Sequence, residues 1–435
     1  MTRVIADFHI HSKYSRATSD KMDLREIARF AQTKGLNIVG TGDATHHKWF
    51  NDLRENLTEL PDAGLYRLAD NPEGPVNFMI TVEVSTIFTF EGSTKKIHHV
   101  ILVPSLDVAA QVNERLARYG DLTVDGRPIL DMTAPQLVEE VMSVSGDNVV
   151  IPSHIWTPWF GLFGAFSGFN QIEDCYQDTT RYVPAIETGL SSDPPMNWRL
   201  SSMDRFALVS NSDSHSSWPW RIGREANVFE LEEDEITYGN IVDAIRKKDG
   251  KLFKFTVETD PNYGKYHFDG HRVCSFSCSP EQTKRLNGFC PRCKRRLTIG
   301  VLSRVEQLAD RPEGFVPKDA IPFKDLIPLY EIISFTMGVE QLYSKKVLDE
   351  QNKLIDRFGN EFNVLLKVSK EELVKVTHEK IADSIVRLRE GKVKFVAGYD
   401  GVYGKPIFGS GENLKDKITG MKIQSSLTDF NAKGP

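Results

Sequence analysis

Short apolar runs alternate with amphipathic stretches over the first 255 residues of the chain. The apolar runs, such as VIADF, NVVIPSH and FALVSNSD, have the length of buried strands. Between them, the stretch DLREIARFAQTKG repeats apolar residues at helical spacing, at Leu24, Ile27 and Ala31. Gly35 closes this stretch in the manner of a helix C-cap. Repeated strand–helix units predict an α/β fold with a parallel sheet, either open or closed into a barrel.

The pattern changes after residue 255. Residues 256–300 are rich in Gly, Pro, Cys and basic residues and have no apolar periodicity. Within residues 301–420, amphipathic helical patterns are followed by the glycine- and aromatic-rich stretch VKFVAGYDGVYGKPIF. We therefore predict four regions, which are an α/β domain over 1–255, a cysteine-containing segment over 256–300, a mainly helical domain over 301–420 and a tail over 421–435.

Composition narrows the class of protein without naming a function. The 435 residues are 40% hydrophobic and 26% charged, which is typical of a globular protein. A net charge of −6 means that any nucleic-acid binding must depend on a local basic patch. The chain has no long apolar run, and MTRVIADF lacks the features of a secretory signal. We expect a cytoplasmic protein that does not contact a membrane.

Histidines and carboxylates gather at or just after the ends of the predicted strands. Side chains two apart on a strand face the same way, so HIH and DSH each aim two ligands at one place. Imidazoles and carboxylates at one rim can hold two or three divalent ions for phosphoryl-transfer chemistry. The sequence leaves open whether His98 or His99 is a ligand. The candidate ligands are His9, His11, Asp43, His46, Glu83, His98, His99, His154, Glu187, Asp213 and His215.

Four of the five cysteines lie in one short window and have the spacing of two zinc knuckles. The window contains Cys-x3-Cys, eleven residues, then Cys-x2-Cys, at Cys274, Cys278, Cys290 and Cys293. The alternative is a set of buried apolar cysteines, but the turn-rich flanks favour a structural zinc site with four cysteine ligands.

A local excess of positive charge surrounds this window. Residues 267–304 contain eight basic and two acidic residues, and the basic ones include Lys294, Arg295 and Arg296. Such a run is often only a solvated face. Because this basic run lies on a knuckle of an otherwise acidic protein, we favour the interpretation that it contacts nucleic acid.

Two further segments border the candidate ligands. HIWTPWFGLFGAFSGF carries Trp156, Trp159, Phe160 and Phe163, which are either core residues or a surface on which an extruded base could stack. Asp193 precedes Pro194, so it either sets up a turn or places a carboxylate that orients the attacking water.

The motifs FHIHSKYS, GTGD, VEVS, PSH and NSDSH, in this order, resemble those of the PHP (polymerase and histidinol phosphatase) superfamily. The resemblance covers about the first 230 residues and implies a distorted seven-stranded β/α barrel with a trinuclear metal centre. By this resemblance His9, His11, Glu83 and Asp213 hold one ion. Glu83 with His98 and His154 holds a second, and His46 with His215 holds a third.

The zinc window, the helical region and AGYDGVYGKPIF extend the resemblance, over nearly the whole chain, to the endonuclease Q family of repair nucleases. The resemblance implies metal-dependent cleavage of DNA on the 5′ side of uracil, hypoxanthine, xanthine and abasic sites, leaving 3′-hydroxyl and 5′-phosphate ends. We expect Zn²⁺ at the cysteines and in the barrel, with Mg²⁺ or Mn²⁺ as alternatives for catalysis. The expected catalytic residues are Glu83, Asp193, Asp213 and His215.

The tail contains QSSLTDF, which places Gln424, Leu427 and Phe430 at offsets of zero, three and six. This pattern resembles the clamp-binding box of proteins that dock on a PCNA-like sliding clamp, and a plain amphipathic tail is the alternative.

Two other functions compete with a nuclease. One is a phosphatase of the histidinol-phosphate type, which would need neither the knuckle nor the tail. The other is a nucleic-acid-binding module with a relic metal site, against which the near-complete ligand set argues.

Overall fold

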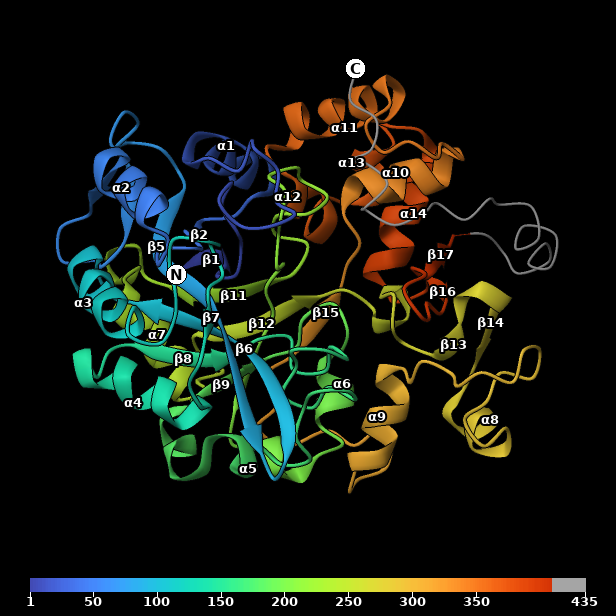
Figure 1. The fold of residues 1–435 in the computed structure, drawn as a ribbon. Helices are drawn as coiled ribbons and strands as arrows, with labels where there is room; N and C mark the ends of the chain where they lie inside the picture. Colours follow the sequence, from blue (N-terminus) through green and yellow to red (C-terminus); the bar gives the residue numbers. More distant parts are fainter. Residues whose placement is uncertain (409–435) are drawn as a thin grey trace, which may run out of the picture.

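The computed structural model describes residues 1–408, and its scaffold is one large mixed sheet (Figure 1). Its strands are β1 (Thr2–Asp7), β2 (Ile38–Gly40), β3 (Leu57–Glu59), β4 (Tyr66–Leu68), β5 (Asn77–Phe90), β6 (Ser93–Val103), β7 (Ile129–Leu130), β8 (Val149–Pro152), β11 (Ala226–Leu231), β12 (Phe253–Glu258) and β15 (Phe323–Asp325). A separate parallel pair is formed by β9 (Ala185–Glu187) and β10 (Ala207–Val209).

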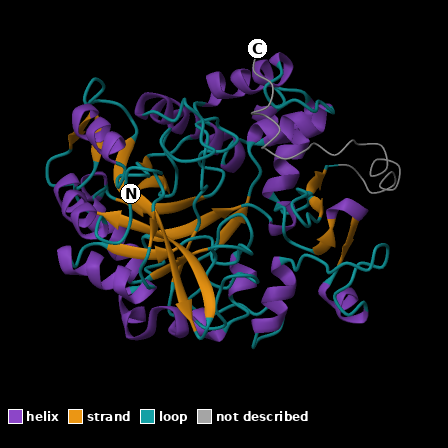
Figure 2. Ribbon diagram, in the orientation of Figure 1, coloured by secondary structure: helices purple, strands orange, loops and turns teal. Residues whose placement is uncertain are grey.

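Helices surround these strands, as Figure 2 shows. They are α1 (Leu24–Lys34), α2 (His47–Asn56), α3 (Leu106–Leu116), α4 (Ala134–Val144), α5 (Ile172–Tyr176), α6 (Pro194–Asn197) and α7 (Tyr238–Arg246), with 3-10 turns η1 (Gln177–Tyr182), η2 (Ser201–Met203) and η3 (Glu233–Glu235). The expected helix α1 begins at Asp23, whose carboxylate accepts hydrogen bonds from Arg25 N and Glu26 N. It ends at Gly35, which has a left-handed φ of 96°.

The predicted α/β class is confirmed, but the sheet is only partly parallel. Strands β1, β2 and β5 are parallel neighbours, whereas β6 is antiparallel to β5 and β8, and β11 is antiparallel to β1. The reason lies in the connection between β5 and β6, which is the two-residue turn Glu91–Gly92 with positive φ at both positions. Such a turn closes a hairpin, whereas a parallel neighbour needs a long crossover.

Alternation along the strands divides the core in two. In β1, β8, β9 and β10, residues of one parity join a shared interior cluster, and their neighbours, such as Ile5, Val150, Ile186 and Leu208, pack outward. This common interior is what a barrel requires. The interior residues include Val4, Ala6, Val149, Ile151, Ala185, Ala207 and Val209.

The remaining chain forms a small hairpin segment and a group of helices beside the barrel. The hairpin segment comprises η4 (Pro261–Tyr263), β13 (Asp269–His271), η5 (Arg272–Cys274), β14 (Phe276–Cys278) and α8 (Pro280–Arg285). The elements that follow are α9 (Val301–Leu308), α10 (Leu329–Met337), α11 (Lys345–Phe358), α12 (Glu361–Leu366), α13 (Lys370–Leu373), α14 (Glu379–Arg389), β16 (Lys394–Val396) and β17 (Lys405–Ile407).

These parts are tied to the barrel, and the predicted boundaries need adjustment. The boundary at 255/256 falls inside β12, and β15 pairs in parallel with β12, so the C-terminal region contributes a strand to the barrel sheet. Lys34 Nζ of α1 lies 2.6 Å from Glu361 Oε1 of α12, and both side chains are buried. The β16–β17 hairpin returns to the small segment, where Asp400 accepts a hydrogen bond from Arg272 N.

Residues 424–430 lie outside the described part of the chain, so the structure does not test the clamp-binding motif with Gln424, Leu427 and Phe430. Among the helices of residues 1–408, none has both the length and the apolarity that crossing a bilayer requires.

Candidate metal centre

The two ligand-rich motifs at opposite ends of the barrel sequence lie side by side. Residues Ile10 and Ser214 form a parallel bridge, and His11 N donates to Ser214 O at 2.9 Å. This contact brings the histidines after β1 next to the Asp-x-His motif after β10. Asp213 itself has a left-handed φ of 46°, a conformation that is uncommon for non-glycine residues.

Four of the candidate ligands converge in a first cluster. It consists of His9, His11, Glu83 and Asp213. His11 Nε2 lies 3.1 Å from Asp213 Oδ1 and 3.3 Å from Glu83 Oε2. His9 Nε2 lies 3.4 Å from the same Glu83 oxygen.

A second cluster adjoins the first and shares Glu83. Its other members are His98 on β6 and His154 after β8. Glu83 Oε1 lies 3.0 Å from His98 Nδ1 and 3.2 Å from His154 Nε2. One oxygen of Glu83 therefore faces each cluster, which is the arrangement of a carboxylate that bridges two metal ions.

The buried atoms of these clusters fit divalent metal ions. His9 Nε2 and Glu83 Oε1 are buried and have no hydrogen-bond partner within residues 1–408. Buried polar atoms are normally satisfied, so unpaired atoms that face other ligand atoms indicate a missing partner. Burial alone would raise the pKa of Glu83, but His98, His9 and Arg127 hold it well below its ordinary value. Imidazole and carboxylate ligands of this kind suit zinc, manganese or iron.

Asp43 and Glu187, which the sequence suggested as ligands, lie behind the histidines instead. Asp43 Oδ1 is 3.0 Å from His11 Nδ1, and its other oxygen accepts hydrogen bonds from Ser12 N and Oγ. Glu187 Oε1 is 3.0 Å from His9 Nδ1. A carboxylate on the far nitrogen fixes the tautomer and orientation of a metal-binding histidine. We therefore assign an orienting role to both carboxylates.

The structure distinguishes His98 from its neighbour His99. Successive side chains on β6 point to opposite faces, and His98 faces Glu83. The two ring nitrogens of His99 contact Tyr176 Oη at 2.7 Å and Thr86 Oγ1 at 2.9 Å. His99 is fully buried with both nitrogens occupied, so it is a core residue and not a ligand.

The predicted third pair, His46 with His215, is not brought together in residues 1–408. His46 Nε2 contacts Thr123 O at 3.1 Å, and its ring stacks on Tyr14. His215 lies instead beside the first cluster, with ring centroids 4.3 Å from His11. Neither histidine belongs to a described group of three or more ligands.

Asp193 belongs to neither cluster. Its carboxylate accepts a hydrogen bond from Met196 N at 2.9 Å and forms the N-cap of α6. Burial raises the pKa of this carboxyl to about 7. The geometry favours the turn-forming alternative over a catalytic role.

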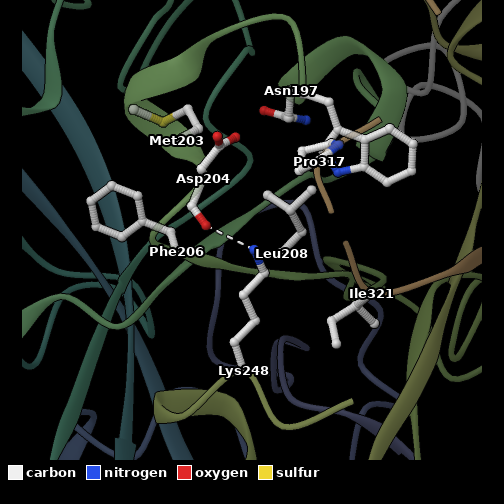
Figure 3. A pocket seen from close by; sticks show the side chains of 9 residues that line it. Asn197, Met203, Asp204, Phe206, Leu208, Lys248, Pro317 and Ile321 are labelled. Carbon is white, nitrogen blue, oxygen red and sulfur yellow. Dashed lines mark hydrogen bonds between the residues drawn. The ribbon is translucent and has the colours of Figure 1, made fainter. Parts of the chain in front are cut away.

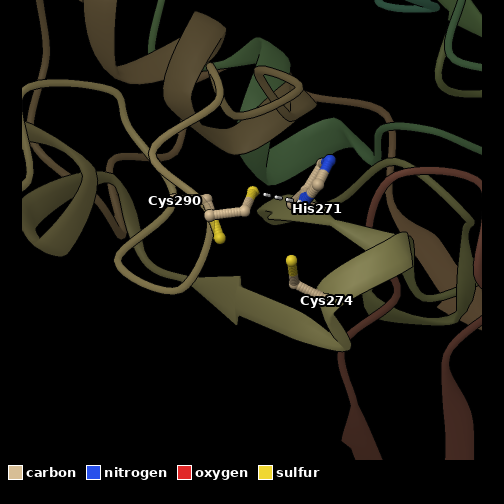
Figure 4. A group of neighbouring side chains, drawn as sticks. His271, Cys274 and Cys290 are labelled. Carbon is tan, nitrogen blue, oxygen red and sulfur yellow. Dashed lines mark hydrogen bonds between the residues drawn. The ribbon is translucent and has the colours of Figure 1, made fainter.

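The predicted zinc site is present as a cluster, but with one different member. Figure 4 shows His271, Cys274 and Cys290 facing one another, and Cys293 completes the group, with its sulfur 3.4 Å from His271 Nδ1. Cys278 does not join them, because its thiol is buried against Thr283 Oγ1 at 3.2 Å. His271 was missed, although the two residues between it and Cys274 repeat the spacing of Cys290 and Cys293. Three cysteines and one histidine are an ordinary zinc ligand set.

The candidate DNA-contacting residues divide into exposed and buried groups. Lys294, Arg295 and Arg296 are all exposed beside the Cys/His cluster. Trp156 and Phe163 are almost completely buried, so their predicted role in base stacking is not supported. Trp159 is 45% exposed, and Phe160 lies against His98 with ring centroids 4.5 Å apart.

Arg304 of α9 fixes the loop that carries these aromatic residues. The buried guanidinium donates hydrogen bonds to Phe163 O at 3.0 Å and to Phe169 O at 2.9 Å. Helix α9 and the loop that follows His154 are thereby connected through one side chain.

A small cavity lies away from both clusters. Figure 3 shows its lining, where Lys248 Nζ donates to Asp204 O at 2.7 Å among side chains such as Phe206 and Leu208. Its volume is about 10 Å³, which is barely room for one water molecule, and no candidate metal ligand lines it.

A barrel with histidines and carboxylates gathered at one end defines a metal-binding α/β protein. The crystal structure of the lesion-specific endonuclease PfuEndoQ from Pyrococcus furiosus matches 97% of this chain and 100% of that protein, with a TM-score of 0.83 and 31% identity. The chain belongs to the endonuclease Q family.

Other similar proteins support this assignment. A structure of endonuclease Q with a 27-mer duplex that has an abasic lesion at the active site matches 95% of this chain at 31% identity, with a TM-score of 0.82. The uncharacterized protein YqxK of Bacillus subtilis is 28% identical over 93% of this chain and 99% of its own length. The uncharacterized protein MJ0043 of Methanocaldococcus jannaschii is 37% identical over 58% of this chain, which spans only 31% of that relative. The MJ0043 C-terminal domain family matches residues 328–392.

Proposed function

We propose that the protein is a metal-dependent DNA endonuclease that cuts the phosphodiester bond on the 5′ side of deaminated bases and abasic sites. The observation that carries the proposal is the pair of ligand clusters sharing Glu83, in a fold that a lesion-specific endonuclease matches over its whole length. A member of the same family binds duplex DNA with an abasic lesion at its active site, which supports DNA as the substrate.

The chain's own residues prepare the site for hydrolysis. His9, His11 and Asp213 would hold one ion, His98 and His154 a second, and Glu83 both. Bound divalent ions supply a water of lowered pKa and neutralise the charge of the phosphodiester. Glu187 and Asp43 hold the rings of His9 and His11 in the orientation that directs Nε2 toward the centre.

Within residues 1–408, the exposed fraction of the side chains at the centre indicates where DNA would approach. The side chains of His9, His11 and Glu83 are at most 1% exposed. Asp213 and His215, in contrast, are 30% and 29% exposed. A phosphodiester would reach the clusters past these two residues, where Glu83 and Asp213 would help to hold the ions.

An exposed aromatic pair on the loop that follows His154 supports recognition of an unpaired base. The rings of Trp159 and Phe166 stack with centroids 4.8 Å apart, and the side chain of Phe166 is 51% exposed. Phe160 of the same loop contacts the ligand His98, so the pair is next to the second cluster. Stacking of a base on such a surface contributes roughly 1–3 kcal/mol.

The Cys/His cluster would hold a structural Zn²⁺ ion and present the basic residues Lys294, Arg295 and Arg296 to the DNA backbone.

The tail residues Gln424, Leu427 and Phe430 would recruit a sliding clamp, and this proposal is based on the sequence motif alone. Deleting residues 421–435 should abolish clamp binding in a pull-down and leave cleavage of short duplexes unchanged. Clamp binding by the truncated protein would refute this role.

The test of the main proposal is cleavage of end-labelled duplexes that differ at one position, which is uracil, hypoxanthine, xanthine, an abasic site or a normal base. We expect a single nick on the 5′ side of each lesion with a suitable metal among Mg²⁺, Mn²⁺ and Zn²⁺, and intact normal duplex. Ligation of the product would verify the 3′-hydroxyl and 5′-phosphate ends. The Asp213→Ala protein is the negative control. Hydrolysis of histidinol phosphate without nicking would refute the nuclease proposal in favour of a phosphatase.

A further inference from the structure

Arg127 lies at the metal centre on a loop whose backbone is fixed on both sides. The loop connects α3 to β7. Gly126 N donates to Tyr14 O at 3.1 Å, and Ser85 N donates to Pro128 O at 2.9 Å. A Cβ at Gly126 would lie only 2.3 Å from Asp43 Oδ2, so glycine is required for this close approach. The backbone therefore holds the Arg127 side chain next to the clusters.

The guanidinium of Arg127 contacts Glu83, the carboxylate that the two clusters share. Its Nη1 lies 3.3 Å from Glu83 Oε2, the oxygen that also faces His9 and His11. This is the guanidinium's hydrogen-bond partner within residues 1–408. A guanidinium has five N–H donors, so most of them are available to a ligand. The side chain is 26% exposed, and it lies close enough to the partly exposed residues Asp213 and His215 for their charges to interact, so it borders the same exposed part of the centre.

The balance of charge favours an anion at this position. The centre contains four carboxylates, which are Glu83 and Asp213 in the clusters and Asp43 and Glu187 behind the histidines, whereas two divalent ions and Arg127 would carry five positive charges. When the ions share the charge of Glu83, the guanidinium needs another acceptor. A phosphodiester supplies two oxygens whose spacing matches the planar donor fork of arginine.

We propose that Arg127 binds the non-bridging oxygens of the scissile phosphate at the exposed part of the metal centre. This inference rests on the proposed nuclease function, and it adds a substrate-contacting residue outside the histidine and carboxylate motifs. Arg127 would position the phosphate for attack by water and stabilise the charge that develops in the transition state. The alternative is that Arg127 only neutralises Glu83, in which case its removal would affect metal binding and not the reaction.

The variants that separate these roles are Arg127→Ala and Arg127→Lys, with Arg118→Ala as the matched control. Arg118 is an exposed arginine just beyond α3, so its substitution removes the same charge from the same connection. Three quantities would be measured, namely metal content by mass spectrometry, the single-turnover rate on an abasic duplex, and affinity for that duplex by anisotropy. Affinity would be measured with calcium replacing the catalytic metal, and gels would verify that the strand is intact.

We expect Arg127→Ala to retain the metal content and melting temperature of the wild type while cleaving roughly 100- to 1,000-fold more slowly. The slope of log affinity against log salt should become shallower by about 0.9, the change for one lost phosphate contact. Arg127→Lys should be intermediate in rate, because lysine keeps the charge without the donor fork.

Equal cleavage by the wild type, Arg127→Ala and Arg118→Ala would overturn the inference and leave the proposed function intact. Loss of metal from Arg127→Ala, with an unchanged salt slope, would also overturn the inference. It would show that Arg127 only neutralises the charge of Glu83. Absence of nicking by the wild type would refute the proposed function itself, and the inference with it.

Discussion

The barrel centre and the Cys/His cluster are two candidate metal sites built in opposite ways. The barrel ligands come from strands between His9 and Asp213, and a large core supports them. The Cys/His ligands come from residues 271–293, where the local core is Cys278, Cys290 and Leu297. We therefore expect the barrel to position its ligands before metal binds, whereas the small segment should need metal in order to fold.

The largest effect on the barrel centre should come from Glu83→Gln, because this residue belongs to both clusters. We expect loss of both barrel metals. The cleavage rate should fall by more than the roughly 10- to 100-fold that is typical when a residue contacting a metal ligand is changed. The circular dichroism spectrum should remain that of the wild type. Unfolding of this variant would contradict the idea that the barrel is formed without its metals.

Loss of a Cys/His ligand should instead damage local structure. We expect Cys290→Ser or His271→Ala to release one zinc ion and to expose residues 265–300 to proteolysis, while the barrel retains its metals. DNA affinity should fall because the basic residues lose their support. Limited proteolysis and metal analysis would measure both effects.

Cys278→Ser is the matched control for the ligand set of this cluster. Cys278 is buried but lies outside the group of four, so its variant should keep the zinc ion. Zinc loss from Cys278→Ser together with zinc retention by His271→Ala would restore the four-cysteine site that the sequence predicted.

A smaller effect is expected from the carboxylates behind the histidines. Glu187→Gln keeps the shape of the side chain but removes the charge that orients His9. We expect metal affinity or cleavage to decrease by roughly 10- to 100-fold. Titration with metal followed by activity would measure the decrease. A loss as large as that of Glu83→Gln would mean that Glu187 binds metal directly.

The smallest effect on cleavage is expected from Asp193→Asn, because asparagine can also cap α6. The folded-state pKa of Asp193 is about 7, above the ordinary value of 3.8. The stability contributed by its proton is therefore fully present below about pH 4 and is lost as pH rises through 7. Asp193→Asn should flatten this part of the stability profile, measured by denaturant unfolding, and leave the cleavage rate unchanged. A rate loss comparable to that of Asp213→Ala would restore the predicted catalytic role.

Much of this protein could be inferred from sequence because strand alternation and ligand spacing are local properties. The α/β class and the ligand-bearing strand ends follow from periods of two, and the pair Cys290 and Cys293 follows from its short spacing, whereas the predicted pairing of Cys274 with Cys278 was wrong. The family resemblance supplied the grouping of His9, His11, Glu83 and Asp213, which the structure brings together.

Only the tertiary structure decided which member of each pattern faces the centre. Alternation shows that His98 and His99 point apart, but the packing of β6 against Glu83 and Tyr176 decides which of them is a ligand. Packing likewise decides that His271, and not Cys278, joins the Cys/His cluster. It also decides that Trp159 is exposed whereas Trp156 is buried. Arg127 has no motif at all, because its position depends on contacts between loops that are distant in sequence. A local pattern specifies which side chains share a face, whereas the direction of that face depends on long-range packing.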